Sequence, residues 1–211
     1  MTADLHSTLL QAVSPFEQGV AGLRIDASRQ PRGRRTRPNR TAAVLVPVLE
    51  RAVPEVILTV RSDQLEQHPG QVSFPGGQVD RGDRSAVSTA LREAREEIGL
   101  RACDVSPLGF LDRLDTVSDF RVLPVVGLVR ASFRWRPDQR EVVEVFTVPL
   151  DVAIDRERYE RHELQRGEHR FVVYSLDWQS HTVWGVTAAI LLNLGERMRS
   201  GAAGAEAPVR P

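Results

Sequence analysis

Three closely spaced glutamates have the carboxylate oxygens that could bind a metal ion. Glu93, Glu96 and Glu97 lie within the stretch 84–98. Residues three and four apart are neighbours on a helix surface, so a helix would gather these carboxylates on one face, where they repel by roughly 0.2–0.5 kcal/mol per pair. A hard divalent cation that prefers oxygen ligands would relieve this repulsion. The spacing therefore predicts a site for a hard divalent cation, a class that includes Mg²⁺ and Mn²⁺.

The opposite side of the same stretch is apolar. A single stripe at helical spacing contains Ala86, Val87, Ala90, Leu91, Ala94 and Ile98. A helix with such a stripe packs on a core and holds its charged face outward. The alternative is a solvated acidic face on which Arg92 and Arg95 neutralise the glutamates.

The residues on either side of this helix favour a binding site over a solvated acidic face. Gly76 and Gly77 let the backbone bend sharply and approach a ligand closely. The turn that contains Asp83 offers a helix N-cap. Gly99 offers a helix stop, because a glycine at that position can take the left-handed conformation. A strand, a glycine loop, an acidic helix and a stop thus form one compact unit.

This unit resembles the signature of the Nudix hydrolase family, which reads Gly, five residues, Glu, seven residues and Arg-Glu-aliphatic-x-Glu-Glu-x-Gly-aliphatic. Here Gly77 is followed by five residues, Asp83, eight residues and the run 92–100. Asp83 stands where the family has Glu, and one residue is added before Arg92. The resemblance implies an α/β/α sandwich with a mixed sheet between helices, and metal-dependent hydrolysis of a pyrophosphate bond.

The resemblance also indicates roles for the residues of the signature. We expect Glu93 and Glu97 to bind the metal, and Glu96 either to bind it or to accept the proton of the attacking water. The backbone of Gly77 would contribute a carbonyl ligand. Arg92 would orient a glutamate through a bidentate pair. Mg²⁺ takes one or two carboxylates per ion and keeps several waters, so three glutamates can serve more than one ion.

The general base is a separate question, because many Nudix enzymes take it from a distant loop. The acidic segment 138–144 precedes a predicted strand and contains two carboxylates that could act in this way, Glu141 and Glu144. The alternative is a solvated loop, since isolated surface carboxylates are common.

Two further segments resemble the accessory motif of the coenzyme A pyrophosphatase branch of that family. The motif reads Leu-Leu-Thr-x-Arg-Ser and then Gly-x-x-x-Phe-Pro-Gly-Gly, and it matches residues 58–62 and 70–77. Glu66 stands where the motif has a basic residue, and similar stretches extend over about 41–194. The resemblance implies coenzyme A as substrate, bound by Arg61, Ser62, Phe74, Gly76 and Gly77.

The composition is that of a globular enzyme. The chain has 211 residues, 41% of them hydrophobic, and its 28 basic and 28 acidic residues cancel. We therefore expect a small-molecule nucleotide as partner, with no nucleic acid and no membrane. The single Cys103 and the absence of a signal-like N-terminus favour the cytoplasm. The sequence leaves open whether the chain forms a homodimer.

The chain divides into three expected regions. Residues 1–40 form an N-terminal extension that ends in a basic linker, 41–198 form the Nudix domain, and 199–211 form a mobile tail. The linker 29–40 is a solvated connector, a grip for substrate phosphates or a nucleic-acid tail. Periodicity predicts strands at 42–49, 55–61, 105–111, 122–129, 142–148 and 169–176, and helices at 84–98 and 182–198.

Three functional hypotheses follow. The first is hydrolysis of coenzyme A or its derivatives to 3′,5′-ADP and 4′-phosphopantetheine. The second keeps the reaction but takes ADP-ribose or another nucleoside diphosphate derivative, because of the acidic Glu66. The third is a catalytically silent binding module of the same fold, which would have no need for a repulsive cluster of glutamates.

Overall fold

The protein is described by a computed structural model. It covers residues 2–18, 40–65, 68–116, 119–166 and 169–205. Most of the expected basic linker and residue Glu66 lie outside these ranges.

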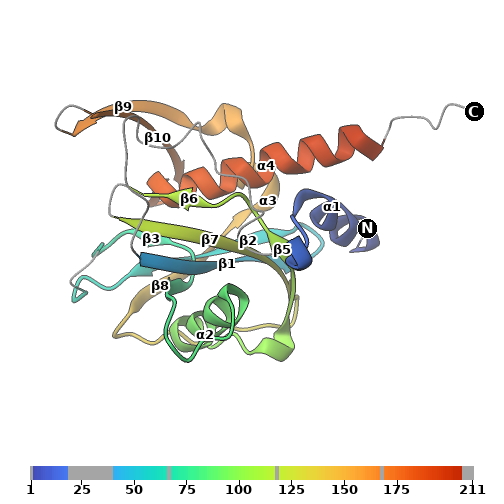
Figure 1. The fold of residues 1–211 in the computed structure, drawn as a ribbon, viewed down its shortest axis with the longest axis horizontal. Helices are drawn as coiled ribbons and strands as arrows, with labels where there is room; N and C mark the ends of the chain where they lie inside the picture. Colours follow the sequence, from blue (N-terminus) through green and yellow to red (C-terminus); the bar gives the residue numbers. More distant parts are fainter. Residues whose placement is uncertain (1, 19–39, 66–67, 117–118, 167–168, 206–211) are drawn as a thin grey trace, which may run out of the picture.

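The centre of the fold is a mixed β-sheet (Figure 1). β1 (Arg40–Glu50) and β7 (Phe120–Arg130) run parallel through its middle, and β2 (Glu55–Arg61) pairs antiparallel with β1. The other strands are β3 (Val72–Ser73), β4 (Gly76–Gln78), β5 (Val105–Phe110), β6 (Leu114–Asp115) and β8 (Val142–Pro149). Within the described ranges the order is β3-β2-β1-β7-β5, with β4 on β1, β6 on β7 and β8 on β2.

The two central strands are buried on both faces, as their nearly continuous apolar sequences require. Side chains alternate along β1, so Ala43, Leu45 and Leu49 enter one hydrophobic cluster while Val46 and Val48 enter the other. Each face of the sheet therefore needs a helical cover. The resulting layers confirm the predicted mixed sheet between helices.

One face is covered by α2 (Ala86–Ile98), the acidic helix (Figure 1). The predicted apolar stripe packs into the cluster on this face. Gly99 ends the helix at φ 73°, as expected from the sequence. The N-cap is Ser85, which exchanges hydrogen bonds with Ser88, and not the turn around Asp83. The capping expectation was therefore wrong, and Asp83 is left for another partner.

The other face is covered by α4 (Gly185–Ala205), with α1 (Thr2–Ala12) packed against it. Leu9 of α1 is fully buried in this core. Backbone hydrogen bonds of 2.8 and 2.9 Å join Ser14 to Phe110 of β5. Part of the expected N-terminal extension thus belongs to the folded unit, and α4 continues past the expected domain end at 198.

A second, antiparallel sheet lies beside the start of α4. Its order is β11-β10-β9, formed by β9 (Glu160–Arg166), β10 (His169–Trp178) and β11 (His181–Trp184). A short helix, α3 (Leu150–Ala153), leads to it from β8. β11 contacts β3 of the main sheet, so this small sheet packs against the main sheet at its edge strand β3. Among the described residues no helix has the length and apolar character that a membrane crossing requires.

Candidate active site

The base of the site is the glycine strand β4, which lies beside the start of β1. A Cβ atom at Gly76 would lie 2.6 Å from the Ala43 carbonyl oxygen, and one at Gly77 would lie 2.6 Å from the Glu93 carboxylate. Neither position has room for a side chain. The sequence therefore brings the helix carboxylate directly onto the backbone of β4, which only glycine allows.

Glu97 is the most deeply placed carboxylate of the site. Its side chain is 2% exposed, and the Gly76 backbone N–H donates a hydrogen bond to it. Arg61 Nη1 lies 3.9 Å from Oε1, while Oε2 is buried with no hydrogen-bond partner among the described residues. Burial raises the pKa of Glu97 to about 8. A buried carboxylate oxygen left unpaired is costly unless another group binds it.

Glu93 lies one turn earlier on the same helix face. Burial raises its pKa, and the nearby charges of Glu96 and Glu141 act in the same direction. Arg92 Nη1 opposes them by donating to Glu93 Oε1 at 2.7 Å and to Glu96 Oε2 at 3.1 Å. The Arg92 guanidinium thus reduces the repulsion between the carboxylates of Glu93 and Glu96.

Arg92 is itself fixed by Asp83. Its Nε and Nη2 donate to the two carboxylate oxygens of Asp83 at 3.1 and 2.9 Å, and the Thr89 hydroxyl donates to Oδ2 at 2.9 Å. These contacts hold the pKa of Asp83 well below its usual range. The expected bidentate partner of Arg92 was a glutamate, and the structure shows Asp83 instead. The signal was present in the sequence, because Asp83 occupies the position of the signature glutamate.

The two candidate bases lie in different surroundings. The charge of Glu141 raises the pKa of both Glu93 and Glu97, so its carboxylate lies near theirs. Its backbone carbonyl accepts a hydrogen bond from the Ser62 N–H at 2.8 Å. Glu144 pairs with His181 at 3.1 Å, and its side chain is 53% exposed. Tertiary structure therefore brings Glu141 to the carboxylate cluster and gives Glu144 a different partner.

The carboxylates do not form a closed cage. Within the described part of the chain, no three His, Cys, Asp or Glu side chains form a ready-made metal cluster. Arg92 forms ion pairs with Glu93 and Glu96, and the side chain of Glu96 is 54% exposed. Mg²⁺ needs only one or two carboxylates when waters and substrate oxygens supply the rest. Glu97, with its unpaired oxygen, and Glu93 therefore fit a divalent ion in an open site.

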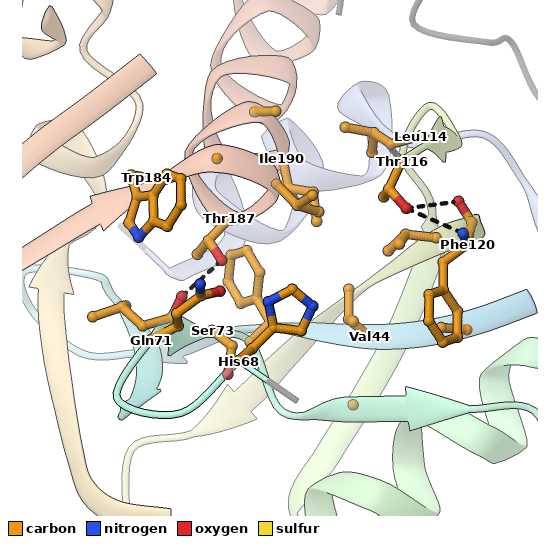
Figure 2. A pocket seen from close by; sticks show the side chains of 18 of the residues that line it. Val44, His68, Gln71, Ser73, Leu114, Thr116, Phe120, Trp184, Thr187 and Ile190 are labelled. Carbon is orange, nitrogen blue, oxygen red and sulfur yellow. Dashed lines mark hydrogen bonds between the residues drawn. The ribbon is translucent and has the colours of Figure 1, made fainter. Parts of the chain in front are cut away.

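A cavity of about 540 Å³ adjoins the glycine strand (Figure 2). Of the residues expected to bind substrate, Arg61, Phe74, Gly76 and Gly77 line it. Ser62 does not: it is 2% exposed, and its Oγ accepts a hydrogen bond from the Gln64 N–H at 3.3 Å.

Two aromatic residues form part of the cavity wall. Trp184 lines the cavity with 42% of its surface exposed, and Phe120 lines it from β7. Periodicity alone does not separate the two kinds of position, because an apolar residue at the mouth of a cavity has the same sequence signal as a core residue. Figure 2 shows the two rings at opposite sides of the cavity.

Fold, site and sequence comparison together define the class of protein as a Nudix hydrolase. The model of the NUDIX domain matches residues 39–180, and the chain belongs to this family. The chain is 48% identical over 155 residues to an uncharacterized Nudix hydrolase, NudL, of Pectobacterium atrosepticum, covering 74% of this chain and 81% of that protein. It is 43% identical over 157 residues to NudL of Yersinia enterocolitica, covering 74% and 80%.

The fold has a counterpart among solved structures. An Ap4A hydrolase of C. elegans, in a binary complex, aligns with a TM-score of 0.50 and 17% identity, over 78% of this chain and 97% of that one. At this identity the similarity supports the fold alone. Nudix hydrolases generally use divalent ions and act on nucleotide-like small molecules, which agrees with the open carboxylate site.

Proposed function

We propose that this Nudix hydrolase cleaves the pyrophosphate bond of coenzyme A or its derivatives, with Mg²⁺ or Mn²⁺, to give 3′,5′-ADP and 4′-phosphopantetheine. The observation that carries the proposal is the position of Glu97. Its buried Oε2 has no hydrogen-bond partner among the described residues, and it belongs to a carboxylate beside the glycine strand that borders a largely apolar cavity.

Glu97 and Glu93 would hold the ion, and a carbonyl of Gly77 would complete the protein ligands. A bound divalent ion offsets the charge of a diphosphate and makes water a better nucleophile. Arg92 keeps Glu93 and Glu96 in place through Nη1, while Asp83 keeps Arg92 in place. Glu96 acts as a further ligand or accepts a proton.

Glu141 is our candidate for the general base. Its carboxylate lies in the electrostatic neighbourhood of Glu93 and Glu97, where it can accept the proton of the attacking water. The hydrogen bond from the Ser62 N–H to the Glu141 carbonyl fixes the backbone there. Ser62 is thus a positioning residue in this proposal and not a substrate contact. Glu144, bonded to His181, is left outside the reaction.

Arg61 supplies positive charge at the junction of the carboxylates and the cavity. Its guanidinium lies 3.9 Å from Glu97 and also lines the cavity. A guanidinium that lines the cavity would donate hydrogen bonds to a phosphate oxygen of the substrate. Phe74 and Gly76 would contact the substrate through the same wall.

A substrate panel tests the proposal. Coenzyme A, ADP-ribose and nucleoside triphosphates are incubated with the enzyme and Mg²⁺ or Mn²⁺, and phosphate-containing products are identified by mass. We expect 3′,5′-ADP from coenzyme A, and a loss of this product by orders of magnitude in Glu97→Gln. Glu157→Gln, at an exposed glutamate far along the chain, is the matched control.

Each other outcome has a clear meaning. If ADP-ribose is hydrolysed in preference to coenzyme A, the proposed substrate is wrong, but the proposed reaction, hydrolysis of a pyrophosphate bond, stands. No turnover of any member, across neutral to alkaline pH, would favour a silent binding module. A cytoplasmic location, a homodimer and a role for the basic linker stay predictions.

A further inference from the structure

The segment that joins β7 to β8, residues 131–141, is bonded through its backbone to the end of α2. The Arg136 N–H donates to the Ile98 carbonyl at 2.8 Å, and the Asp138 N–H donates to the Glu97 carbonyl at 2.9 Å. Both carbonyls belong to the last turn of α2, where no N–H further along the helix can reach them. The segment thus caps the helix at Glu97, the residue whose buried carboxylate is central to the site.

Gly99 makes this close approach possible. A Cβ atom at this position would lie 3.2 Å from the Arg136 Cβ and 3.3 Å from the Arg136 carbonyl oxygen. The φ of 73° lies in the left-handed region, where a residue other than glycine is strained. The chain therefore turns away from the helix at Gly99 and leaves the carbonyls of the last turn to the segment 131–141.

Asp138 also builds the turn that ends at the candidate base. Its carbonyl accepts hydrogen bonds from the N–H groups of Glu141 at 2.9 Å and Val142 at 2.8 Å. Its Oδ1 accepts from the Arg140 N–H at 3.0 Å, which closes an Asx turn. Arg140 Nε also donates to the two carboxylate oxygens, at 3.0 and 3.2 Å. The bonds from the side chain and backbone of Arg140 lower the pKa of Asp138 to about 2, so the carboxylate is an acceptor at neutral pH.

The backbone of Glu141 is thus held on both sides. Its N–H is bonded to the Asp138 carbonyl, and its own carbonyl accepts from the Ser62 N–H at 2.8 Å. Two successive hydrogen bonds through Asp138 therefore connect the backbone of Glu141 to that of Glu97. This connection is geometric, and it is independent of the charge interactions between the carboxylates.

We propose that Asp138 is a positioning residue, which fixes the base Glu141 relative to the metal ligand Glu97. The inference rests on the proposed function, in which Glu141 accepts the proton of the attacking water. A base must lie within hydrogen-bond reach of that proton, and a shift of about 1 Å can cost about 100-fold in rate. Asp138 acts through Glu141 in this role, and its carboxylate does so by keeping the turn 138–141 closed.

Replacement of Asp138 by alanine removes the acceptor of the Asx turn. We expect Asp138→Ala to lower kcat about 10–100-fold while KM changes less than about threefold, because the substrate contacts lie elsewhere. Asp138→Asn keeps an oxygen that can accept from the Arg140 N–H. It loses the ion pair with the Arg140 side chain, which is 86% exposed and contributes little. The asparagine variant should therefore recover most of kcat.

Asp155 provides a matched control, because it makes the same kind of turn between α3 and β9. Its Oδ1 accepts from the Glu157 N–H at 3.1 Å, and its Oδ2 accepts from Arg158 Nε at 3.3 Å. The preceding residue, Ile154, packs against the cluster beneath α4, on the face of the sheet opposite α2. Asp155→Ala should keep kcat. A loss equal to that of Asp138→Ala would overturn the inference.

A double-mutant cycle separates positioning from a general structural effect. Asp138→Ala is made in the unchanged enzyme and in Glu141→Gln, and kcat is measured for all four proteins. If Asp138 acts through Glu141, the alanine change has no further effect once the base is gone. Losses that add in the double variant, or an unchanged kcat in Asp138→Ala, would overturn the inference.

Amide hydrogen exchange of the full-length protein, followed by NMR without substrate, tests the turn independently of turnover. We expect the amides of Glu141 and Val142 to exchange at least about tenfold faster in Asp138→Ala, and at the original rate in Asp138→Asn. Unchanged exchange in Asp138→Ala would overturn the inference even if coenzyme A is hydrolysed. Faster exchange in a protein that hydrolyses no member of the substrate panel would support the anchoring by Asp138 and refute the proposed function.

Discussion

Arg92 holds Asp83 by both carboxylate oxygens, through Nε at 3.1 Å and Nη2 at 2.9 Å. The third nitrogen, Nη1, is then free to donate to Glu93 and Glu96. Asp83, which lies outside the helix face that carries the glutamates, thus sets the orientation of the Arg92 guanidinium that pairs with Glu93 and Glu96. Planar guanidinium geometry makes this possible, because its donors point in fixed directions.

Replacement of Asp83 by asparagine removes this anchor. Only 7% of the Asp83 side chain is exposed, so we expect Asp83→Asn to lower the free energy of unfolding by about 1–3 kcal/mol. Activity falls roughly 10–100-fold as Arg92 loses its orientation. Denaturant unfolding and kcat/KM measure the two effects.

Asp80→Asn is the matched control for this change. Asp80 lies 3.7 Å from the same Arg92 Nη2, but its side chain is 72% exposed. Exposed ion pairs contribute little, so we expect a change of at most about 1 kcal/mol. Equal effects of the two variants would contradict the anchoring role of Asp83.

Gly77→Ala tests the close approach of helix and strand. The added Cβ would lie 2.6 Å from the Glu93 carboxylate, which must then move. A displacement of about 1 Å in a catalytic group can cost about 100-fold in rate, and we expect a loss of that order. Gly82→Ala, where a Cβ meets nothing within 4 Å, should leave the rate unchanged. Full activity in Gly77→Ala would show that Glu93 need not contact β4.

Glu97 predicts a pH dependence of stability in the metal-free protein. Its pKa rises from 4.5 to about 8 on burial, so the folded state holds this proton more tightly than the unfolded state does. The contribution is therefore most favourable below pH 4.5, and it is lost as pH rises toward 8, with a slope of at most about 1.4 kcal/mol per pH unit.

Glu97→Gln should flatten this part of the profile and should be the more stable protein at pH 8 without metal. Added Mg²⁺ should stabilise the unchanged protein by about 2.7 kcal/mol at a hundredfold excess over its Kd, and should stabilise Glu97→Gln less. Thermal unfolding from pH 5 to 8, with and without Mg²⁺, measures both effects. Parallel profiles for the two proteins would rule out the buried, unpaired carboxylate.

Glu141→Gln should lower kcat about 10²–10⁴-fold if this residue accepts the proton of water. The acidic limb of the pH–rate profile should also disappear, which a merely structural change would not cause. Glu144→Gln should keep both the rate and the profile, because Glu144 is paired with His181. The opposite ranking of the two variants would assign the base to Glu144.

Several local features of the fold were predictable from the sequence, although the helix expected at 182–198 begins only at Gly185, after the strand β11. The apolar stripe and Gly99 defined α2, and long apolar runs defined β1 and β7, because these signals depend on residues near one another in the chain. The short strands β3, β4 and β6 were not predicted. Two or three residues carry no periodicity, and pairing with a neighbour alone makes them strands.

The site divides in the same way. The sequence by itself determined that Glu93, Glu96 and Glu97 share a helix face, because helical spacing is local geometry. Only the tertiary structure decided the partners from outside the helix. Asp83 became the partner of Arg92, Glu141 came near the carboxylates, and Trp184 lined a cavity. Asp83 lies only nine residues before Arg92, but Glu141 and Trp184 come from distant parts of the chain, and their positions follow from how the sheet and helices pack together.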